Sequence, residues 1–111
     1  MDIADWRRRI DDLDRKIVEL ISARALAAQE IGKLKRSTSM PIYEPNRERI
    51  IFDNVRAANR GPLPDIELQH IYERIVEVMR ALQREELASG GDQTDRSGTS
   101  SGKAGETVKE P

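Results

Sequence analysis

Arg24 stands where an apolar residue is expected. Apolar side chains recur at alternating steps of three and four residues along the first third of the chain, and Arg24 takes one place in that series, which otherwise consists of Ile10, Leu13, Ile17, Leu20, Ala27, Ile31 and Leu34. This spacing is typical of an amphipathic helix. A guanidinium in an apolar stripe is costly unless its charge is paired. Arg24 therefore predicts contact with a carboxylate, either of the protein or of a ligand.

Two further cations on the same predicted helix could join Arg24 at an anion. Lys35 is eleven residues further on, which puts it within about 20° of the same face and about 16 Å along the axis. Arg7 precedes Arg24 by seventeen residues, about 25 Å, which is too far for both to hold one small anion within a single chain. In an antiparallel dimer, Arg7 of the second chain could reach the same anion as Arg24 of the first. The alternative for Arg7, which lies in the run RRR, is an ordinary surface cation.

Three helices are predicted to position these residues. The first extends from about Ile3 to Arg36 and ends in STSMP, whose Ser, Thr and Pro residues favour a loop. The second opens with YEPNRE, where Pro45 suits a first helical turn, and stops at NRGP. The third runs from Pro64-Asp65 to about Leu87, with apolar side chains at steps of four and three.

Composition places the chain among single-domain, helix-rich proteins: 35% of its 111 residues are charged and 37% are hydrophobic. We expect one all-helical domain over residues 1–88 and a disordered tail over residues 89–111, which are rich in Gly, Ser and Thr. Lys and Arg (19) nearly balance Asp and Glu (20), so the overall charge favours neither nucleic acid nor a membrane as partner. The chain has no cysteine, no apolar run of membrane length and no leader-like start, which predicts a cytoplasmic location.

The predicted first helix is too long for one small domain. About 33 helical residues extend about 50 Å, more than the width of a compact domain of fewer than about 90 residues. Because the two shorter helices cannot cover its stripe, we predict an intertwined homodimer whose long helices run antiparallel across a two-fold axis. With the axis near Val18, Arg7 of the partner subunit would lie opposite residue 29, between Arg24 and Lys35. The alternatives are a monomeric three-helix bundle with a kinked first helix and a parallel coiled coil.

A longer ordered set of residues accompanies these cations. It consists, in order, of Arg7, Ile10-Asp11, Leu13-Asp14, Ile17, Leu20, Arg24, Ile31-Gly32, Lys35, PIYEPNRE, NRGPLP, Ile71-Tyr72 and Leu82-Gln83. This set, which covers about Asp5 to Leu87, resembles the all-helical chorismate mutases, including those fused to prephenate dehydratase. The resemblance implies an enzyme that rearranges chorismate to prephenate in phenylalanine and tyrosine biosynthesis. It implies no metal, no cofactor and no covalent catalyst.

The resemblance also implies roles for individual residues. Arg24 and Arg7 of the partner subunit would grip the two carboxylates of chorismate, because guanidinium groups bind carboxylates in a bidentate manner. Lys35 and Gln83 would donate to the ether oxygen, which becomes more negative as its C–O bond breaks. Glu48 would accept a hydrogen bond from the ring hydroxyl. Two more residues would shape that end of the site: Glu44 and Arg47.

Two positions depart from the family pattern. Glu44 stands where many members have aspartate, which keeps a carboxylate but lengthens its reach. Met79 stands one turn before Gln83, where a serine is often found, so packing in the core is an alternative to contact with substrate. Other assignments also have alternatives: Gln83 could be solvated at a helix end, and Glu48 could serve only as a charge favoured at a helix N-terminus.

Two other function classes share these features. Isochorismate-pyruvate lyases use the same helical scaffold with a similar cationic pocket, although IYEPNRERI and NRGPLP resemble the mutase pattern more closely. A non-enzymatic helical dimerisation or regulatory module could use the charged stripe residues only to fix helix register. Incubation with chorismate or isochorismate, and binding of a dicarboxylic transition-state analogue, would distinguish the three.

Overall fold

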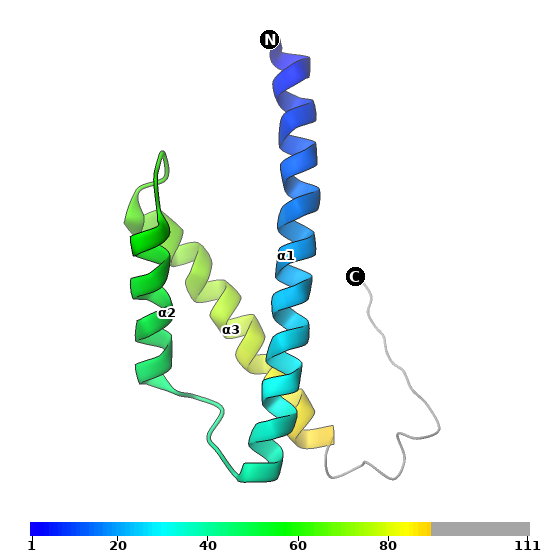
Figure 1. Ribbon diagram of the computed structural model, residues 1–111, viewed down its shortest axis with the longest axis vertical. Coiled ribbons are helices and arrows are strands. Elements are labelled where there is room, and N and C mark those ends of the chain that lie inside the picture. The colour runs from blue at the N-terminus through cyan, green and yellow to red at the C-terminus, as the bar shows by residue number, and fades with distance from the viewer. Residues whose placement is uncertain (90–111) are drawn as a thin grey trace, which may run out of the picture.

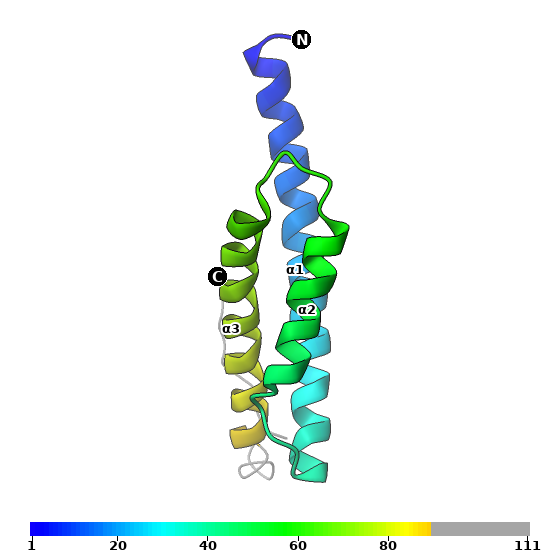
Figure 2. The same ribbon diagram turned by 90° about the vertical axis from the view of Figure 1, so that its left-hand side faces the viewer.

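The computed structural model describes residues 1–89, which form three helices and their connections. They are α1 (Ile3–Thr38), α2 (Pro45–Ala58) and α3 (Asp65–Ser89), and these residues contain no strand. α2 and α3 run in opposite directions from their short connection, and the N-terminal part of α1 extends well past that connection (Figure 1 and Figure 2). The predicted all-helical class is thereby confirmed. The predicted tail lies outside the described residues, apart from Ser89.

Helix α1 begins with a reciprocal cap and ends slightly later than the sequence predicts. Asp2 accepts from the backbone N–H of Asp5, and Asp5 accepts from the backbone N–H of Asp2, which lowers the pKa of Asp5. The helix was predicted to end near Arg36, but it includes Ser37 and Thr38. Both hydroxyl groups donate to the carbonyl of Leu34, at 2.9 and 2.8 Å. These hydrogen bonds form within the last turn of the helix, so the two side chains are compatible with helical backbone there.

The other helix ends agree closely with the sequence pattern. Pro45 is the first residue of α2, as predicted. The side chain of Asn59 organises the connection to α3, because its Nδ2 donates to Leu63 O at 2.9 Å and to Asp65 Oδ1 at 2.7 Å. At its other end α3 passes the predicted limit near Leu87 and includes Ser89, whose hydroxyl donates to Glu85 O at 3.0 Å.

The core lies where α1 and α2 pack against α3. The buried apolar side chains of the described residues are Ala28 on α1 and Val76 and Met79 on α3. Gly32 permits a close approach of α1 to α3: a Cβ there would lie 3.0 Å from the Cα of Gln83 and 3.0 Å from the Cβ of Glu86. A glycine in mid-helix thus lets the two backbones come together beside Gln83.

The apolar stripe of α1 remains uncovered within one chain, as its length predicted. Leu13, Ile17 and Leu20 are 48%, 51% and 71% exposed, and Val18 beside them is 62% exposed. α1 is one continuous helix without a sharp bend (Figure 1 and Figure 2), whereas the monomeric alternative expects a kink in it. A single chain therefore leaves a long apolar face in water, and such faces mark sites of protein association.

Candidate active site

A cleft of about 380 Å³ lies between the three helices and the segment that joins α1 to α2. The sequence predicted eight site residues, and seven of them line this cleft: Arg24, Lys35, Glu44, Arg47, Glu48, Met79 and Gln83. They come from all three helices, so only the folded chain brings them together. The eighth, Arg7, does not line the cleft.

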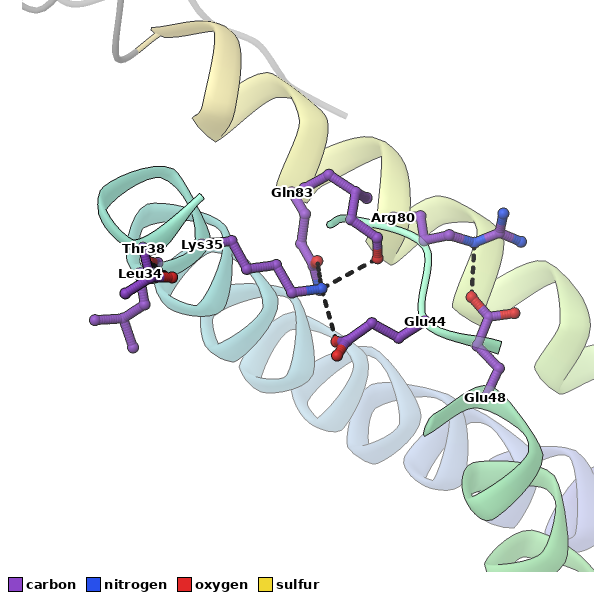
Figure 3. Close-up of polar contacts among 8 residues, drawn as sticks. Leu34, Lys35, Thr38, Glu44, Glu48, Arg80 and Gln83 are labelled. Atoms are coloured by element: carbon purple, nitrogen blue, oxygen red, sulfur yellow. Dashed lines mark hydrogen bonds and ion pairs between the residues drawn. The ribbon is translucent and has the colours of Figure 1, made fainter. Parts of the chain in front are cut away.

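Lys35 is the most enclosed charge in the cleft. Its side chain is 5% exposed, and Nζ donates to Gln83 Oε1 at 2.9 Å and to Ile42 O at 3.1 Å (Figure 3). Glu44 Oε2 lies 2.9 Å from the same Nζ and forms an ion pair with it. An ammonium group has three N–H bonds, so these acceptors can satisfy all of them. This full set of partners explains how a lysine is accommodated in so enclosed a position.

Gln83 faces Lys35 and is not a solvated residue at a helix end. Its side-chain amide is oriented by the ammonium group: Lys35 can only donate, so the amide oxygen must be the atom that faces it. The amide NH₂ of Gln83 then remains available as a donor. Together the two side chains place an ammonium and an amide N–H at one end of the cleft.

The two glutamates take different cations as partners. Glu44 precedes the first turn of α2, but its side chain makes no capping hydrogen bond to the helix and reaches Lys35 instead. Glu48 lies in the first turn of α2, and its Oε2 is 2.9 Å from the Nε of Arg80 (Figure 3). Glu48 is therefore more than a charge favoured by the helix N-terminus, because it is paired across the cleft with α3.

Arg24 and Arg47 are the cations of the cleft without an acidic partner. Within residues 1–89 neither guanidinium lies within 4.0 Å of a carboxylate oxygen. The cleft is lined by four cations, namely Arg24, Lys35, Arg47 and Arg80, and by the two carboxylates Glu44 and Glu48. The resulting excess of two positive charges suits a ligand with two negative charges.

Arg7 lies near the start of α1, and within one chain it is remote from the cleft. Seventeen residues separate it from Arg24, about 25 Å along a straight helix, and its side chain is exposed. The geometry of the single chain therefore agrees with the predicted separation. Whether a second chain brings Arg7 to the cleft stays a prediction.

Met79 and Arg80 are neighbours on α3 with different surroundings. Met79 is 4% exposed and forms part of the core as well as the cleft wall, which is the packing role that the sequence left open. Arg80 also lines the cleft, and the sequence analysis did not identify it. The signal was its spacing: Arg80 precedes Gln83 by three residues, which places both on one side of α3.

The described residues offer neither a cluster of metal ligands nor a membrane-spanning helix. Within them, no cluster of three or more His, Cys, Asp or Glu side chains is arranged to hold a metal ion. None of α1, α2 and α3 combines the length and apolar character needed to cross a membrane.

Comparison with known proteins gives a consistent picture. The family model for chorismate mutase type II matches residues 6–84. The chorismate mutase of Methanocaldococcus jannaschii is 31% identical over 86 residues, which cover 77% of this chain and 87% of that protein. The bifunctional chorismate mutase/prephenate dehydratase of Aquifex aeolicus is 33% identical over 87 residues, 75% of this chain but 24% of its own length.

The comparison with a solved structure agrees. The chorismate mutase (form II) of Thermus thermophilus superimposes with a TM-score of 0.72 and 32% sequence identity, over 74% of this chain and 93% of that chain. The bifunctional relatives are much longer proteins, and this chain spans about a quarter of the Aquifex aeolicus enzyme and 23% of its counterpart from Pseudomonas aeruginosa.

Proposed function

Because the chain belongs to the chorismate mutase type II family, we propose that it rearranges chorismate to prephenate. The observation that carries the proposal is the charge of the cleft. Two guanidinium groups without acidic partners, Arg24 and Arg47, lie in one cleft with the enclosed Lys35. Chorismate carries two carboxylates, so its charge matches the excess of two positive charges that line the cleft.

The reaction needs only positioning and charge stabilisation from the protein. In one pericyclic step the ether C–O bond of chorismate breaks while a C–C bond forms, and no proton is transferred. The cleft can restrain the flexible enolpyruvyl group in its compact reactive conformer, which removes an entropic barrier. It can also stabilise the negative charge that develops on the ether oxygen.

Lys35 and Gln83 are the donors that we assign to the ether oxygen. The three acceptors around Lys35 hold its ammonium group in the cleft. Substrate would take the place of one of them, and the amide NH₂ of Gln83 would supply a second donor. Donors that are already oriented need little reorganisation in the transition state, which is the basis of their effect on rate.

The remaining residues would bind the ends of the substrate. Arg24 and Arg7 of the partner subunit would grip the two carboxylates. Glu48 would accept from the ring hydroxyl, with Glu44 and Arg47 shaping that end. Met79 would contribute shape to the wall, since it has no hydrogen-bond donor to offer a carboxylate.

The proposal includes a homodimer. A core of three buried apolar side chains is small for the described residues, whereas the stripe of α1 leaves Leu13, Ile17 and Leu20 about half exposed or more. A second copy in antiparallel orientation would cover that stripe. With a two-fold axis near Val18, it would also carry Arg7 to the level of residue 29, beside the cleft.

The direct test is incubation of the purified chain with chorismate. We expect chorismate to disappear much faster than in buffer, with prephenate as the product identified by NMR. A parallel incubation with isochorismate, monitored for pyruvate, tests the lyase alternative. Pyruvate release without prephenate formation would replace the mutase proposal. A folded protein that turns over neither compound and does not bind a dicarboxylic transition-state analogue would favour the non-enzymatic module.

A further inference from the structure

The contact between Glu48 and Arg80 joins α2 to α3 across the cleft (Figure 3). The Nε of Arg80 is 2.9 Å from Oε2 of Glu48, and the two side chains are 30% and 16% exposed. A carboxylate so little exposed needs a nearby positive charge. Within residues 1–89, Arg80 is the cation that lies within 4.0 Å of a Glu48 oxygen, whereas Lys35 pairs with Glu44.

Arg80 is itself held in place by Tyr43. Its guanidinium carbon lies 5.2 Å from the centre of the Tyr43 ring, within the range of a cation–π interaction. Its Nε is buried and has no acceptor in hydrogen-bond geometry among the described residues, so it holds Glu48 by charge rather than by an aligned hydrogen bond. The ring and the carboxylate thus fix the guanidinium from two directions.

We propose that Arg80 is a positioning residue that orients Glu48 for the substrate. The inference rests on the proposed function, in which Glu48 accepts a hydrogen bond from the ring hydroxyl. A carboxylate has two oxygens that can accept. Arg80 holds Oε2 and leaves Oε1 free for the hydroxyl.

A second consequence concerns the cations that must remain free. Arg24 and Arg47 line the same cleft and have no acidic partner in the described residues. A Glu48 side chain released from Arg80 would be attracted to these guanidinium groups and would compete with the substrate carboxylates. Arg80 therefore preserves the positive charge of the cleft by engaging the carboxylate that would otherwise reduce it.

A double-mutant cycle tests this role. We expect Arg80→Met to raise KM for chorismate by about tenfold with kcat changed less than about threefold, because the hydroxyl contact exists in both ground and transition states. Adding Arg80→Met to Glu48→Gln should change KM by less than about twofold, because the residue that Arg80 orients has already lost its charge. Arg80→Lys, which keeps the charge, should recover part of the loss.

Controls separate this role from folding and from direct binding. Arg84→Met, one turn further along α3 at an exposed position, should have wild-type KM and kcat. A purely structural role for Arg80 would lower the active fraction, and so the apparent kcat, without a change in KM. Direct binding of substrate by Arg80 would make the effects of Arg80→Met and Glu48→Gln multiply. Either result would overturn the inference about Arg80. The proposed function would still stand if the wild type turns over chorismate. An inactive wild type would overturn both.

Discussion

At the scale of single residues, Lys35 is the group on which the proposed chemistry depends most. We expect Lys35→Ala to lower kcat by about a hundredfold or more, in the range seen when one donor to a developing negative charge is removed. KM should change less, because the donation strengthens in the transition state. Steady-state kinetics with chorismate would measure both. Lys33→Ala is the matched control, since Lys33 is exposed and pairs with Glu30 on the outer side of α1. An equal loss in both variants would contradict this role for Lys35.

Gln83 offers a test through pH. In Gln83→Glu, a neutral carboxylic acid could still donate to the ether oxygen, whereas the ionised carboxylate would repel it and pair with Lys35. We therefore expect the activity of this variant to rise as the pH falls, relative to the wild type at each pH. The profile of kcat/KM against pH for both proteins measures this. If the pH profiles of the variant and the wild type were parallel, Gln83 would not be a donor to the ether oxygen.

The candidate site could be predicted from the sequence where helix spacing decides it. Arg24 and Lys35 share a face because eleven residues are close to three helical turns, and both line the cleft. The spacing of Arg80 from Gln83 could have placed it on the cleft side of α3, but its pairing with Glu48 lies between two helices, and no periodicity within one element reveals such a pair. The contacts of Lys35 with Ile42 O and Glu44 were equally unpredictable, because the path of the α1–α2 connection brings both acceptors to Lys35.

At the scale of elements, Gly32 sets the distance between α1 and α3. In Gly32→Ala the new Cβ would meet the Cα of Gln83 at 3.0 Å and its carbonyl oxygen at 3.1 Å, so backbone has to move. Overpacking of this kind lowers the free energy of unfolding by about 1 to 3 kcal/mol, and the higher helix propensity of alanine offsets up to about 1 kcal/mol of that loss. We expect lower stability in thermal unfolding and lower kcat, because Gln83 moves away from Lys35.

A control on the same helix isolates that effect. Ser22→Ala also improves helix propensity, and it lies about 200° from Arg24, on the opposite face of α1. It should leave stability and kcat unchanged or slightly raised. If Gly32→Ala behaved in the same way, the close approach of α1 to α3 would not position Gln83.

The helices themselves were largely predictable because periodicity, proline and capping signals agree. Their ends were less so. Ser37 and Thr38 are weak helix formers, yet each hydroxyl finds the carbonyl of Leu34 within the helix, and this local bonding extends α1 by two residues. Ser89 extends α3 in the same manner through Glu85. Such bonds depend on the rotamer of one side chain, which composition does not determine.

At the scale of the whole molecule, the exposed stripe of α1 predicts a dimer. We expect a solution mass of two chains at micromolar concentration, measured by sedimentation or scattering. Ile17→Asp, near the expected axis, should give single chains and lose activity, because it places a charge in the apolar interface. Arg15→Asp, on the opposite face, should remain dimeric and active. A wild-type mass of one chain would contradict the assembly.

The shared site is tested most directly by mixing two inactive variants. Arg7→Ala and Arg24→Ala should each inactivate both sites of a homodimer, because each site would contain Arg24 of one chain and Arg7 of the other. After joint unfolding and refolding, about half of the dimers should contain one chain of each kind. One site of such a dimer lacks both arginines and the other keeps both. Chorismate turnover should then return to roughly a quarter of the wild-type level per total chain, assuming random pairing. Turnover near zero, with mixed dimers demonstrated by mass, would contradict an active site built from two chains.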